Sequence, residues 1–86
     1  MKHAGAAALV RIDGLLAQLR AVDGLVERKP GIFYRGSRAF LHFHEDPTGL
    51  YADVRFASGE DFVRVPVNTR TERANLLREV KKLSVG

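Results

Sequence analysis

The residues best suited to chemistry gather in the stretch AFLHFHED, residues 39–46. His42 and His44 stand one residue apart, and Glu45 and Asp46 follow them directly. The alternation of apolar and polar residues predicts a β-strand, in which side chains two positions apart share a face. Both imidazoles should therefore point the same way, while Glu45 points to the other face or into a turn. Three kinds of site fit this pair: a metal site, an acid–base pair, or the polar outer face of a sheet.

The turns on either side predict what lies across from the histidines. If DPTG is a four-residue loop between antiparallel strands, His42 faces Asp53. If ASGE is a second such loop, Asp53 faces Arg64. These three residues would form one row across three strands. The next row would contain Phe40, Arg55 and Phe62.

A metal could use His42 and His44 as a two-ligand arm, with Asp53 as a third ligand. Two features argue against this site. Arg64 would compete for Asp53, and His3 is expected to be remote from the pair. We therefore expect neither a metal nor another cofactor.

Acid–base catalysis could use His42 and Asp53 as a dyad, because a carboxylate beside an imidazole raises the affinity of the ring for a proton. That hypothesis predicts a small RNA-cleaving or other hydrolytic enzyme. The alternative is a cross-strand network that only stabilises the sheet. We favour the alternative, and hence a protein that is not an enzyme.

Alternation also predicts an open face that is rich in aromatic and arginine side chains. Such a face suits single-stranded RNA, because rings stack on bases and arginines contact phosphates. It equally suits a homodimer or another protein partner, and a binding or assembly module is our leading functional expectation. The predicted binding residues are Phe33, Arg35, Phe40, His44, Tyr51, Arg55, Phe62 and Arg64.

The composition is that of an ordinary globular protein. The chain has 86 residues, no cysteine and a net charge of +4. Residues 62–86 hold six basic and two acidic residues and so carry the whole excess of positive charge, which attracts polyanions. No apolar run is long enough to cross a bilayer. We expect a single domain over residues 1–86, soluble and cytoplasmic, without a membrane partner.

The periodicity predicts an α+β fold of order α-β-β-β-β-α. One helix should cover residues 6–22, and a last helix should follow a capping box at Thr69 and Glu72 and end near Ser84. The four strands are predicted at 32–35, 39–45, 50–56 and 62–67. LVER, residues 25–28, is a marginal further strand. Both helices should cover one face of a four-stranded antiparallel sheet. The buried face should contain Ile32, Tyr34, Leu41, Phe43, Leu50, Ala52, Val54, Phe56, Val63, Val65 and Val67.

Two resemblances add to this reading. FYRGSRAFLHFHEDPTGLYADVRF, residues 33–56, resembles a family of small bacterial conserved hypothetical proteins of unassigned activity. VRVPVNTRTERANLLREVKKL, residues 63–83, resembles the end of HicA-type toxins, which are small ribonucleases with a double-stranded-RNA-binding-like fold. Those toxins carry a catalytic histidine in a Gly-Ser-His segment. The matching segment here is Gly36-Ser37-Arg38, so this resemblance implies the fold rather than the nuclease activity.

Overall fold

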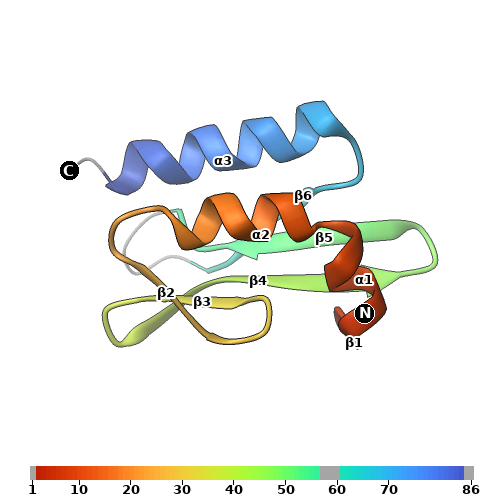
Figure 1. Ribbon diagram of the computed structural model, residues 1–86, viewed down its shortest axis with the longest axis horizontal. Coiled ribbons are helices and arrows are strands. Elements are labelled where there is room, and N and C mark those ends of the chain that lie inside the picture. The colour runs from red at the N-terminus through yellow and green to blue at the C-terminus, as the bar shows by residue number, and fades with distance from the viewer. Residues whose placement is uncertain (1, 57–60, 85–86) are drawn as a thin grey trace.

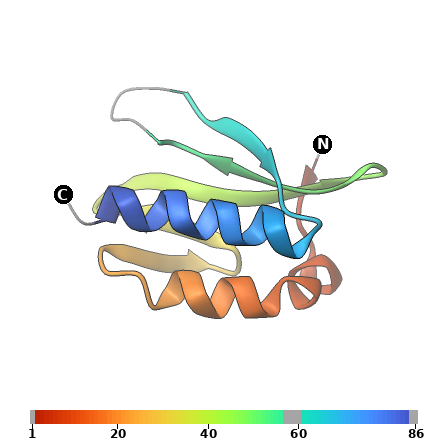
Figure 2. The ribbon, with the colours of Figure 1, turned by 90° about the horizontal axis from the view of Figure 1, so that it is seen from above.

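The structure is a computed structural model that describes residues 2–56 and 61–84, and Figure 1 shows it as a ribbon. The described part has an α+β fold, and its helices all lie on one face of the sheet (Figures 1 and 2). None of these helices is long and apolar enough to cross a membrane. The elements are β1 (Lys2–His3), α1 (Ala6–Arg11), α2 (Asp13–Arg20), β2 (Leu25–Lys29), β3 (Ile32–Arg35), β4 (Arg38–Asp46), β5 (Gly49–Val54), β6 (Val63–Pro66) and α3 (Arg70–Ser84).

The sheet has more strands than the predicted four. Its order is β2-β3-β4-β5-β6, with antiparallel neighbours, and β1 pairs with β4 beside β3. The marginal strand LVER is therefore a full member, β2. β1 was not predicted at all. It has a place because β3 pairs with β4 only as far as His42, which leaves the end of that edge free for His3 to pair with His44.

The predicted N-terminal helix is divided into two. α1 ends at Arg11, α2 begins at Asp13, and Ile12 between them leaves helical geometry with φ −115° and ψ 27°. A β-branched residue followed by aspartate and glycine is a weak helical segment, which explains the position of the break. The Ile12 side chain stays fully buried across it.

A β-bulge at Phe40 overturns the predicted faces of β3. Phe33 pairs with Leu41, but Tyr34 pairs with Ala39, so Phe40 has no partner in β3. The extra residue turns Phe40 toward the helices next to Leu41, and the two are 4% and 0% exposed. Phe33 is also completely buried. Ile32 and Tyr34, predicted in the core, alternate with it and are only half-buried.

The rest of the predicted core is largely confirmed. Residues of β4, β5 and the segment after β6 pack against α2 and α3 in one buried cluster. Val63 begins the edge strand β6 and is 45% exposed, which contradicts its predicted burial. Phe56 and Val65 are only partly buried and pack against the cluster. The confirmed buried residues are Leu41, Phe43, Leu50, Ala52, Val54 and Val67.

The predicted capping box of α3 is confirmed. The hydroxyl of Thr69 accepts a hydrogen bond from the backbone N–H of Glu72 at 3.1 Å. The Glu72 carboxylate accepts one from the N–H of Thr69 at 3.0 Å and one from Asn68 at 2.8 Å. These bonds satisfy amides at a helix start that have no partner within the helix.

Candidate functional site

The open face of the sheet carries the predicted row of polar residues. His42 pairs with Asp53, and Asp53 pairs with Arg64, as the predicted turn lengths required. His44 lies across from Tyr51. The first of the two turns is shorter than the predicted four residues, because Asp46 pairs with Gly49, but the register is the predicted one. The predicted loop ASGE lies outside the described residues.

Asp53 is the buried anchor of this row. Only 6% of the residue is exposed. Its two oxygens accept hydrogen bonds from Nε and Nη2 of Arg64, at 2.7 and 2.9 Å. One of them also lies 3.1 Å from Nδ1 of His44. Among the described contacts the imidazole within ion-pair distance of Asp53 is that of His44, whereas the strand register had suggested His42.

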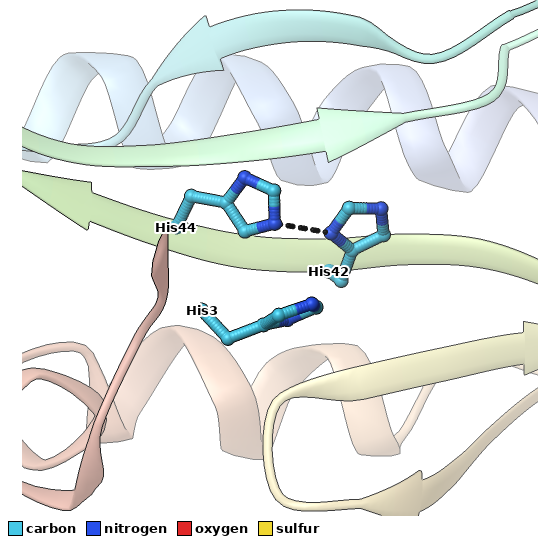
Figure 3. A group of neighbouring side chains, drawn as sticks. All are labelled: His3, His42 and His44. Atoms are coloured by element: carbon cyan, nitrogen blue, oxygen red, sulfur yellow. Dashed lines mark hydrogen bonds between the residues drawn. The ribbon is translucent and has the colours of Figure 1, made fainter. Parts of the chain in front are cut away.

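Nδ1 of His44 lies between two partners, 3.1 Å from an oxygen of Asp53 and 3.2 Å from Nη2 of Arg64. The Arg64 hydrogen bond lowers the pKa of Asp53, so the carboxylate is ionised and can only accept. A protonated Nδ1 donates to Asp53, whereas an unprotonated Nδ1 accepts from Arg64, so the two contacts belong to different tautomers of His44. In both tautomers Nε2 of His44 faces Nδ1 of His42 at 3.0 Å (Figure 3).

His3 completes a cluster of three imidazoles, which corrects the expectation that it is remote. The pairing of β1 with β4 places it beside His44. The ring centroid of His3 is 4.7 Å from that of His44 and 5.4 Å from that of His42. One ring nitrogen from each histidine lies within 4.8 Å of the others. In Figure 3 the three rings gather on the same side of the sheet.

The two central imidazoles are tuned toward the neutral form. Burial lowers the pKa of His42, and the neighbouring His44 lowers it further. Burial also lowers the pKa of His44. Asp53 acts in the opposite direction on both rings but does not outweigh burial. The predicted effect of Asp53 on the pKa of His42 therefore has the right direction, but burial and His44 together outweigh it.

The open face of the sheet carries fewer aromatic side chains than predicted. Phe33 and Phe40 lie in the core and cannot stack on a ligand from the open face. Phe62 remains, with its ring edge-on to His42 at 4.6 Å between centroids. Tyr51 also remains and shares a hydrogen bond with Thr48 through its hydroxyl. Homodimerisation and the binding of single-stranded RNA stay predictions. Two of the four aromatic residues predicted to take part in them are buried rather than on the open face.

Comparisons with protein-family models, with curated proteins and with solved structures find no match to this chain. Both family resemblances accordingly stay predictions. His3 is the site residue that sequence reasoning missed. A two-residue strand has no periodicity of its own, so the only available signal was the presence of a further histidine.

Proposed function

We propose that this protein binds a divalent transition metal, Zn²⁺ in the first instance, through His3, His42 and His44. The observation that carries the proposal is the convergence of three imidazoles from two strands that are about forty positions apart in the sequence. Imidazole nitrogen is a preferred ligand of zinc, copper and nickel, and sets of three histidines hold zinc in proteins.

The distances support a metal between the rings. Two imidazole ligands at about 2.0–2.1 Å from a tetrahedral ion are separated by roughly 3.3 Å. The facing nitrogens of His42 and His44 are 3.0 Å apart, within a few tenths of an ångström of that value. His3 is exposed on a short strand, so it can close the remaining distance and leaves a fourth position toward solvent.

Asp53 supports the site from behind His44. A metal-bound histidine commonly donates its other ring N–H to a carboxylate, which fixes the ring orientation and makes it a stronger ligand. An oxygen of Asp53 lies 3.1 Å from Nδ1 of His44, so it can accept that N–H when the ring binds a metal through Nε2. Arg64 occupies the same carboxylate, so Asp53 is an orienting group here rather than the third ligand that the sequence suggested.

The two lowered histidine pKa values favour the same function. A metal competes with protons for imidazole, and a lowered pKa weakens that competition near pH 7.

The test is a calorimetric zinc titration of untagged protein freed of metal with a chelator. We expect one Zn²⁺ per chain and no binding of Mg²⁺, which prefers oxygen ligands. His3→Gln, His42→Gln and His44→Gln should each weaken zinc binding at least about tenfold. Asp53→Asn should weaken it by about 10–100-fold without removing a ligand.

Tyr51→Phe is the matched control, since it lies across from His44 and contacts no ring of the cluster in the described contacts. It should leave zinc affinity unchanged. Unaltered affinity in His3→Gln, or equal loss in Tyr51→Phe, would show that the three-histidine site is not the binding site.

A further inference from the structure

A concave site, lined by none of the three histidines, lies at one end of the sheet. It is a pocket of about 520 Å³ formed where β3 turns into β4 and where β5 ends. Three arginines line it, and no acidic residue does so among the residues that the structure describes. We call it the arginine pocket; its lining residues are Gly24, Arg35, Gly36, Arg38, Ala39, Phe40, Arg55 and Phe56.

Two of the guanidinium groups are held in place by aromatic rings. The guanidinium carbon of Arg35 lies 5.3 Å from the ring centre of Phe40, and that of Arg55 lies 4.4 Å from Phe62. Arg35 also donates a hydrogen bond to the carbonyl of Leu83 at 3.1 Å, at the end of α3. Side chains ordered before binding lose less conformational entropy when a ligand arrives.

Arg55 carries an unmet hydrogen bond. Its Nε is buried and has no hydrogen-bond partner. A buried N–H without an acceptor is costly, and a missing ion is one of its ordinary explanations. The backbone of Arg55 is tied to the same region, because its N–H donates to the carbonyl of Phe40 at 2.9 Å.

A second group of cations, in the groove between α2 and α3, offers less. Arg73 donates to the backbone carbonyl of Val67, Arg78 bonds Asn75, and Lys82 bonds Glu79. These partners already satisfy several of the hydrogen-bond donors in the groove. Arg70 and Lys81 in that groove have no described side-chain partner, and the same is true of Arg38 in the arginine pocket. The arginine pocket differs in that it holds the buried, unsatisfied Nε of Arg55.

We propose that the arginine pocket binds the phosphate group of a phosphorylated ligand. Three guanidiniums exceed what one carboxylate requires, but they match a phosphate, which has close to two negative charges and three oxygens. The planar fork of arginine suits these oxygens better than an ammonium group does. The source of the phosphate can be the free ion, a nucleotide or the end of an oligonucleotide, and the titrations below separate these sources.

The test is an NMR titration that follows backbone amides and the Nε–H signals of arginine. Inorganic phosphate, a nucleoside monophosphate and a short single-stranded RNA with a 5′-phosphate are added in separate experiments. We expect the Nε–H signal of Arg55 to shift with all three. Tighter binding of the nucleotide than of phosphate would assign the ligand to that class, and equal binding would assign recognition to the phosphate alone.

Two variants probe the pocket and one provides the control. Arg38→Gln and Arg55→Lys should each weaken phosphate binding at least tenfold, the second because lysine keeps the charge but lacks Nε. Arg70→Gln removes the same charge from the α2–α3 groove and should have no effect. Equal weakening by Arg70→Gln, full affinity in Arg55→Lys, or binding of the RNA without any binding of phosphate would overturn the proposal.

Discussion

Protonation of His42 and His44 should change the free energy of unfolding directly. Each is held in the folded protein with a lowered pKa, chiefly because burial disfavours the charged ring. Positive charge on both rings at once is opposed further by repulsion, because their facing nitrogens are 3.0 Å apart. The folded protein therefore resists protonation that the unfolded chain accepts freely.

We predict that the free energy of unfolding of the metal-free protein falls as the pH is lowered below 6.5, the ordinary histidine pKa. In that range the unfolded chain binds more protons than the folded protein, so stability decreases with falling pH. Above it both states hold neutral rings and the contribution of these histidines is constant. Urea unfolding between about pH 5 and 8 measures the slope.

The double variant His42→Asn, His44→Asn is the control for this slope. It removes both titrating groups and should flatten the dependence of stability on pH above about pH 5. An equally steep slope in the double variant, or a flat profile in the natural chain, would contradict the assignment.

At the scale of single elements, local signals in the sequence predicted two strand registers and one helix start correctly. Turn length gave the registers of β4 with β5 and of β5 with β6, and with them the row from His42 to Arg64. The capping box gave the start of α3. The bulge at Phe40 had no such signal, because two consecutive apolar residues fit a regular strand equally well, and one extra residue was enough to reverse the faces of β3.

The capping box supplies a stability prediction at this scale. Thr69→Ala removes the hydroxyl that accepts the Glu72 N–H and should lower the free energy of unfolding by about 0.5–2 kcal/mol. Thr71→Ala, an exposed substitution within the same first turn, is the matched control and should change it by less than about 0.5 kcal/mol. Chemical denaturation of both variants makes the comparison. Equal effects would show that the cap does not stabilise α3.

For the molecule as a whole, the two-residue strand β1 is a long-range connection. β1 connects the start of the chain to the centre of the sheet, and it delivers the one ligand of the proposed metal site that does not come from β4. That placement depends on pairing between distant parts of the chain, which no local pattern encodes. A metal bound there would link the two segments in the folded state only.

We therefore predict a large effect of zinc on thermal unfolding. At a free zinc concentration 100 times Kd, binding to the folded state alone adds about 2.7 kcal/mol of stability. For a chain of this size that is roughly 10–20 °C in Tm. Scanning calorimetry with and without Zn²⁺ measures the shift. At the same zinc concentration, a tenfold loss of affinity in His3→Gln should remove about half of this stabilisation, and a greater loss should remove more. A full shift that persists in this variant would show that β1 does not contribute to the stabilisation by zinc.

The position of β1 also bears on how this sheet avoids aggregation. Exposed strand edges recruit other chains through their unpaired backbone groups, and natural proteins interrupt or cover them. β6 carries Pro66, which has no N–H to offer, and the pairing of β2 is irregular between Glu27 and Lys29. β1 and the following Ala4 N–H, which bonds the carbonyl of Phe43 at 3.0 Å, cover the part of β4 that β3 leaves bare. The short segment that presents His3 thus also protects an inner strand against edge-to-edge association.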